Sequence, residues 1–155
     1  MDVQINGRAA RFADLRPGAF FCALRAESLF GICVTDGTIK GALLFSEAPK
    51  QSGNPWLVDR GLPNDAIVMF PSAVMKADLS SVSATGGSPP FGAIISSGED
   101  YLIRASAGLG NAVTFNLSTG MIVEISTQTT SIVFPNWQIG HCENHKFEPL
   151  FSFKA

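Results

Sequence analysis

Residues 19 to 45 read AFFCALRAESLFGICVTDGTIKGALLF, and this stretch decides the fold class. It holds three apolar runs, which are Ala19–Leu24, Leu29–Val34 and Thr38–Phe45. The polar residues Arg25 to Ser28 separate the first two runs, and Asp36-Gly37, a dipeptide that favours turns, precedes the third. Apolar runs this short, with turn signals between them, predict three β-strands in an antiparallel meander.

Further short apolar runs closed by turn residues continue this pattern toward the C-terminus. They are Trp56–Asp59, Ala66–Phe70, Phe91–Ser96, Tyr101–Ser106, Ala112–Leu117, Met121–Thr127, Ile132–Ile139 and Phe147–Phe153. No long stretch shows the 3.6-residue period of an amphipathic helix. We therefore expect a single all-β domain over residues 1–155, with about ten mostly antiparallel strands in a barrel or a two-sheet sandwich.

The pattern divides at residues 80–90 (SSVSATGGSPP), an uncharged stretch rich in Ser, Gly and Pro that is typical of a linker. Gly18-Ala19-Phe20-Phe21 before it resembles Gly92-Ala93-Ile94-Ile95 after it. Ile67 to Pro71 likewise resembles Ile132 to Pro135. These similarities predict an internal pseudo-two-fold duplication with half-units 12–79 and 91–145. The alternative is chance, because any two meanders built from Val, Ile, Phe and Gly align somewhere.

Charge is sparse along the whole chain. Charged residues make up 15% of it, against about a quarter in an average protein, and the formal net charge is −2. The densest basic group is Arg8, Arg11 and Arg16, too small for the phosphate contacts that nucleic acid requires, so we expect no nucleic-acid partner. A weakly charged surface resists association poorly, which favours self-association or a protein partner.

The longest apolar stretch, from Ala19 to Val34, is interrupted by Arg25 and Glu27. A membrane-spanning helix needs about 20 consecutive apolar residues, so we expect no membrane partner. No signal peptide is recognisable in the first residues, and we expect a cytoplasmic location.

One short segment concentrates groups that could carry chemistry. His141, Cys142 and His145 lie within five residues, and imidazole and thiolate groups bind Zn²⁺. On an extended strand, however, residues four apart are separated by about 13 Å, too far to share one ion. The simpler interpretation is a polar loop before the last strand. A hydrolase or metal enzyme using this segment is the least favoured alternative.

The two tryptophans, Trp56 and Trp137, are the other candidates, as ligand-binding or interface residues. Indole combines a large apolar area with one hydrogen-bond donor, which suits sugar stacking and protein interfaces. Each follows a proline by one or two residues, near a strand end where a side chain can be exposed, although burial in the core is the simpler expectation for both.

The sequence therefore favours a non-catalytic, β-rich binding or assembly module of the kind that forms one component of an oligomer or a larger particle. No catalytic residue and no cofactor is predicted. A small-molecule or carbohydrate-binding protein is the main alternative, because loops at one end of a β-fold commonly form such sites.

Overall fold

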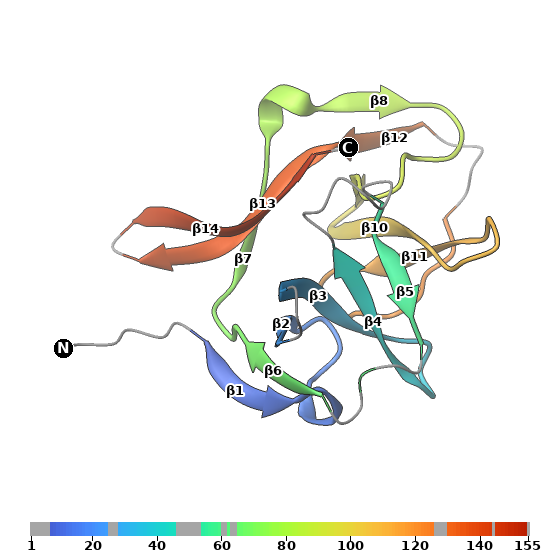
Figure 1. Ribbon diagram of the computed structural model, residues 1–155. Coiled ribbons are helices and arrows are strands. Elements are labelled where there is room, and N and C mark those ends of the chain that lie inside the picture. Colours follow the sequence, from blue (N-terminus) through green and yellow to red (C-terminus); the bar gives the residue numbers. More distant parts are fainter. Residues whose placement is uncertain are drawn as a thin grey trace.

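The computed structural model describes residues 7–24, 28–45, 54–59, 62, 65–125, 130–143 and 145–154 (Figure 1). These residues form strands and two short 3₁₀ helices, so the all-β prediction is confirmed. The strands are β1 (Arg8–Arg11), β2 (Phe20–Leu24), β3 (Ser28–Thr35), β4 (Lys40–Phe45), β5 (Trp56–Val58), β6 (Ala66–Met69), β7 (Val74–Ala77), β8 (Ser83–Thr85), β9 (Ile94–Ser97), β10 (Asp100–Ser106), β11 (Ala112–Asn116), β12 (Ser131–Phe134), β13 (Asn136–Glu143) and β14 (Lys146–Lys154). The 3₁₀ helices are η1 (Phe12–Asp14) and η2 (Leu79–Ser81).

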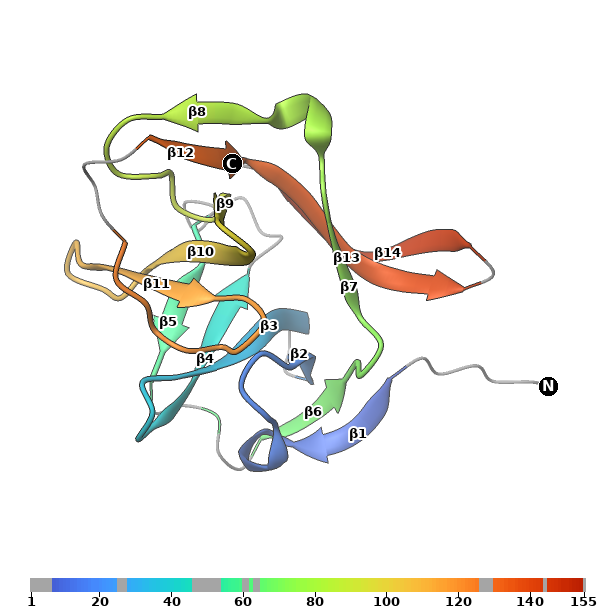
Figure 2. The ribbon, with the colours of Figure 1, turned by 180° about the vertical axis from the view of Figure 1, so that it is seen from behind.

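The strands form two sheets. The large sheet has the order β1-β6-β2-β3-β4-β5-β10-β9-β12-β8, with β11 paired to β10, and the second sheet has the order β14-β13-β7. Figures 1 and 2 show the hairpin of β13 and β14, with β7 next to β13, apart from strands β2 to β5. Every strand pairing in the described residues is antiparallel except the short contact between β5 and β10.

The barrel alternative is wrong, because β1 and β8 end the large sheet without closing it. The cause lies at Pro71 and Pro135. Each follows a strand of the large sheet, β6 or β12, and proline has no N–H to continue the ladder. The chain leaves the large sheet at both prolines, and the strands that follow, β7 and β13, pair with each other. The predicted single strand Ile132–Ile139 is thus two strands in different sheets.

The predicted linker 80–90 is also more than a linker, because it contains β8, which pairs with β12. Polar residues did not prevent this pairing, since an edge strand needs only one ladder of hydrogen bonds and leaves one side in solvent. No helix in the described part of the chain is long and apolar enough to cross a membrane.

The strand pairings of the two halves of the chain correspond. The first set has the order β1-β6-β2-β3-β4 and the second has β8-β12-β9-β10-β11. The registers match as well: Phe20 lies opposite Ile32 as Ile94 lies opposite Ile103. The correspondence includes β1 and β8, which lie outside the predicted half-units 12–79 and 91–145. That the two sets arose by duplication remains a prediction.

The second sheet covers one face of the large sheet, and Trp137 lies at the centre of the core between them. Its side chain is 1% exposed, and its indole N–H donates to the carbonyl oxygen of Gly92 at 2.7 Å. The ring of Phe153 stacks on it with centroids 5.0 Å apart, and Phe45 and Phe151 contact it at 5.2 and 5.7 Å. This aromatic cluster fixes β13 and β14 against the large sheet.

Gly92 is required where this cluster meets the large sheet. Its φ is +78°, and a Cβ at this position would overlap the ring of Phe153. Gly98 has a similar φ of +62° but no atom within 4 Å of such a Cβ. The two glycines therefore share the same backbone constraint and differ only in packing.

We expect Gly92→Ala to destabilise the fold more than Gly98→Ala. Both carry the cost of a left-handed residue, about 1–2 kcal/mol, and only Gly92→Ala adds overpacking of about 1–3 kcal/mol. Urea unfolding followed by tryptophan fluorescence measures both. Equal losses would contradict the placement of Phe153 on Gly92.

Candidate functional site

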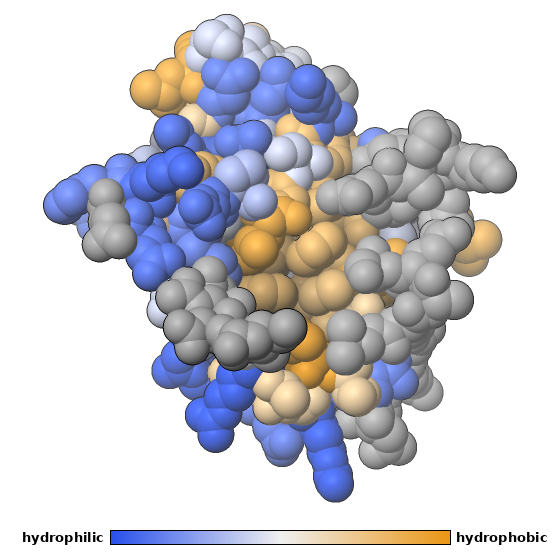
Figure 3. Space-filling view, turned by 60° about the vertical axis from the view of Figure 1, so that its left-hand side comes forward, coloured by the Kyte–Doolittle hydropathy of each residue, from blue (hydrophilic) through white to orange (hydrophobic). Residues whose placement is uncertain are grey.

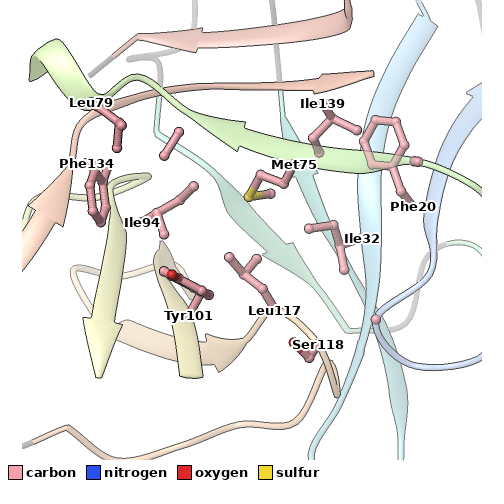
Figure 4. Close-up of a pocket in the computed structure, with 13 residues that line it drawn as sticks. Phe20, Ile32, Met75, Leu79, Ile94, Tyr101, Leu117, Ser118, Phe134 and Ile139 are labelled. Carbon is pink, nitrogen blue, oxygen red and sulfur yellow. The ribbon is translucent and has the colours of Figure 1, made fainter. Parts of the chain in front are cut away.

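A cavity of about 480 Å³ lies between the two sheets (Figure 4). Its walls come from β2, β3, β7, β9, β10, β12, β13, the helix η2, and the segments that precede β2 and β7 and follow β11. The lining residues are Gly18, Phe20, Ile32, Ala73, Met75, Ala77, Leu79, Ile94, Tyr101, Leu117, Ser118, Phe134 and Ile139. Cavities of this volume are in the range that holds small organic ligands.

The side chains of the cavity wall are almost all apolar. Met75 points from β7 toward Leu117 on the opposite wall, as Figure 4 shows. The side-chain polar groups of the lining are the hydroxyls of Tyr101 and Ser118. Tyr101 is 52% exposed and Leu79 is 73% exposed, so both lie at the mouth. Among the described residues, no Asp, Glu, His, Lys or Arg lines the cavity.

The surface also segregates apolar from polar residues. Figure 3 shows apolar residues gathered in a band on one face, with hydrophilic residues beside it. Apolar patches of this kind on a protein surface commonly mark interaction sites. Apolar and hydrophilic residues are therefore not evenly mixed on this face.

The structure does not bring the predicted metal ligands together. His141 is buried and its ring lies 5.7 Å from that of Phe70, while Cys142, the next residue on β13, is exposed. Adjacent residues of a strand point to opposite faces, so these two side chains diverge. His145 is exposed in the turn before β14, with a φ of +63°. The described residues include no group of three or more His, Cys, Asp or Glu that could hold a metal ion.

The predicted polar loop over this segment is also corrected. Residues 140–143 continue β13, and the hairpin to β14 turns immediately afterwards. Glu143 pairs in register with Lys146 across the turn, while Asn144 lies outside the described residues. The Nε2 atom of His141 is buried and has no hydrogen-bond partner among the described residues, an arrangement that lowers the stability of a fold.

Neither tryptophan forms an exposed binding platform. Trp137 is a core residue whose N–H donor is already used, and Trp56 on β5 is half-buried against a second apolar cluster. That cluster lies on the other face of β4, where Ala42 and Leu44 point away from the main core. The candidate residues that sequence reasoning missed are those of the cavity, among them Ala73 and Ala77, whose importance lies in their small size.

Cys33 is the most perturbed titratable group of the described residues. Burial raises its pKa to about 11, although the positive charge of Lys40 nearby acts in the opposite direction. A thiol with so high a pKa carries almost no thiolate at neutral pH, and thiolate is the nucleophilic form. Cys33 is therefore a packing residue and not a candidate nucleophile.

Comparison of the chain with protein-family models, with curated proteins and with solved structures gives no match. The site must be interpreted from its own geometry and chemistry.

We expect iodoacetamide to modify Cys142 in the folded protein while Cys33 remains unmodified at pH 8. Cys142 is exposed, whereas Cys33 is buried and keeps its proton until the pH approaches 11. Peptide mass spectrometry after a short reaction measures both sites, and reaction in urea serves as the control in which Cys33 is accessible. Equal modification of the two in the folded state would contradict the described burial.

Proposed function

We propose that this protein is a non-catalytic binding module whose cavity between the two sheets receives an apolar group. The observation that carries the proposal is the cavity itself: about 480 Å³, open at Tyr101 and Leu79, and lined by aliphatic and aromatic side chains. Apolar surface removed from water stabilises a complex by about 25 cal/mol per Å², so such a wall favours apolar occupants.

The composition of the wall argues against the other classes considered. Carbohydrate sites need several hydrogen-bond partners for hydroxyl groups, and this wall offers two hydroxyl side chains, Tyr101 and Ser118. A hydrolase needs a nucleophile with a base in contact, and none of the described residues that line the cavity is a His, Cys, Asp, Glu or Lys. On the sequence grounds of sparse charge and absent basic clusters, we also propose protein partners or self-association, no nucleic acid, and a cytoplasmic location.

We expect the neutral apolar dye Nile red to bind at one site per chain with a rise in fluorescence. Ala77→Phe adds a ring to the cavity wall and should weaken this binding about tenfold, equivalent to roughly 1.4 kcal/mol. Ala9→Phe is the matched control, because Ala9 lies exposed on β1 and outside the cavity.

Fluorescence titration of the three proteins decides the outcome, with thermal unfolding to show that each is folded. Absence of binding to the unmodified protein, or equal loss in both variants, would overturn the proposal.

A further inference from the structure

The second sheet has a near two-fold relation at its centre. β7 and β13 run antiparallel with Met75 opposite Ile139, and each of these residues is the fourth after its proline, Pro71 or Pro135. A rotation that exchanges β7 with β13 therefore exchanges Met75 with Ile139. Beyond β13 lies β14, but no strand of the described residues lies beyond β7. The sheet is complete on one side of the axis and open on the other.

Two aromatic residues of β14 fill the space on the complete side. Phe151 contacts Phe30, Phe45 and Trp137 at centroid distances of 5.6, 5.4 and 5.7 Å. Phe153 stacks on Trp137 and lies against Gly92. These neighbours define a receptor site for an extended strand that carries rings at alternate positions.

The strand registers identify which residues take the same places on the open side. Cys22 lies opposite Phe30 as Ser96 lies opposite Tyr101, so Tyr101 corresponds to Phe30. Phe45 lies opposite Phe30, and the N–H of Leu117 donates to the carbonyl of Tyr101 at 2.9 Å, so Leu117 corresponds to Phe45.

The remaining two neighbours follow in the same way. The N–H of Gly18 donates to the carbonyl of Cys33 at 2.7 Å, and that of Gly92 to the carbonyl of Arg104 at 2.8 Å. Cys33 and Arg104 are each two residues before the end of their strands, so Gly18 corresponds to Gly92. Ala73, two residues after Pro71, corresponds to Trp137, two residues after Pro135.

All four counterparts line the cavity: Gly18, Ala73, Tyr101 and Leu117. The cavity is thus the open-side equivalent of the site that β14 occupies. Alanine at position 73 leaves free the volume that an indole fills at position 137. The ring of Tyr101 is 52% exposed, whereas that of its counterpart Phe30 is covered by Phe151.

The edge of β7 supplies backbone groups for an added strand. The N–H of Asp78 donates to the carbonyl of Asn136 at 2.9 Å, which makes 78–136 a hydrogen-bonded pair. Such pairs alternate along an antiparallel ladder, so Lys76 and Val74 bond to β13 while the N–H and C=O groups of Met75 and Ala77 point to the open edge. A small molecule would leave these groups without a partner, whereas an extended polypeptide satisfies them.

We propose that the open edge of β7 receives an extended segment of a partner protein, which adds as a fourth strand and inserts alternate large apolar side chains into the cavity. This inference rests on the proposed function of the same cavity and names its occupant. An aromatic side chain fits beside Met75, as Phe151 does beside Ile139. The carbonyl oxygen of Ser118 lies close to Gly18, so the second inserted side chain is shorter than Phe153.

The test uses the full chain and a fluorescent peptide with the sequence of residues 146–154 in which Phe153 is replaced by the shorter Leu, KFEPLFSLK, because β14 is the template. The backbone groups of β13 bond alternately to β7 and to β14, so the amides of Phe151 and Phe153 face β13 and that of Ser152 faces away. In the added peptide the amides at the same positions face β7. N-methylation of the peptide at positions 151 and 153 should weaken binding about tenfold or more, and N-methylation at position 152 should not. These two peptides form a matched pair that requires no change in the protein.

A protein variant separates the open site from the one that β14 already fills. Ala73→Trp copies the indole of Trp137 into the cavity and should abolish peptide binding, whereas Ala9→Trp on exposed β1 should leave it unchanged. Fluorescence anisotropy measures peptide binding, and Nile red binding is measured on the same samples.

Peptide binding that depends on the facing amides and on Ala73 supports the inference. Nile red binding without peptide binding overturns it and leaves the proposed function standing, while loss of both overturns both. Equal binding of the two N-methylated peptides overturns strand addition. A dimer in light scattering that the peptide dissociates would replace the partner protein by a second copy of this chain.

Discussion

Proline cannot donate a backbone hydrogen bond, and this constraint at Pro71 and Pro135 organises the whole molecule. Each proline ends a strand of the large sheet, and the chain must leave the ladder there. The two departing segments satisfy their backbone groups by pairing with each other, which creates the second sheet. The core, the cavity and the position of Trp137 all follow from this pairing, because β13 carries the indole over the large sheet.

The two sides of the second sheet show how one backbone arrangement supports opposite packing outcomes. On one side large rings from β13 and β14 close the core, and Gly92 leaves room for Phe153. On the other side Ala73 stands at the place that corresponds to Trp137, and the space stays open. Filling the space with rings restricts the size of the side chain at several positions, whereas leaving the cavity open exposes its apolar wall to water. A protein that keeps such an opening maintains an unfavourable surface that a binding partner can relieve.

Local patterns were sufficient to predict part of this structure. Asp36-Gly37 and the short apolar runs beside it predict the meander, and the repeated Phe-Pro step marks where both sets of strands end. Whether the large sheet closes into a barrel was not predictable. The barrel and the two-sheet fold share the same strands and differ in the pairing of β7 with β13, which are about 60 residues apart in the sequence. The cavity was not predictable for a related reason: Ala73 carries no signal by itself and matters only by comparison with Trp137. The prediction of a loop from His141 to Glu143 was wrong because polar composition is typical of loops, whereas β13 continues through this segment.

The aromatic residues on β14 have a consequence for biosynthesis. Phe151 and Phe153 close onto Phe30, Phe45 and Gly92, which precede them by many tens of residues. While a ribosome is still translating this region, strands β2 to β10 can already be outside the exit tunnel with the rings of Phe30 and Phe45 uncovered. Contacts of such long sequence separation form late and slowly. The nascent chain therefore passes through a stage with both receptor sites empty. For one of them this stage ends when the hairpin of β13 and β14 forms and Phe151 covers Phe30 and Phe45.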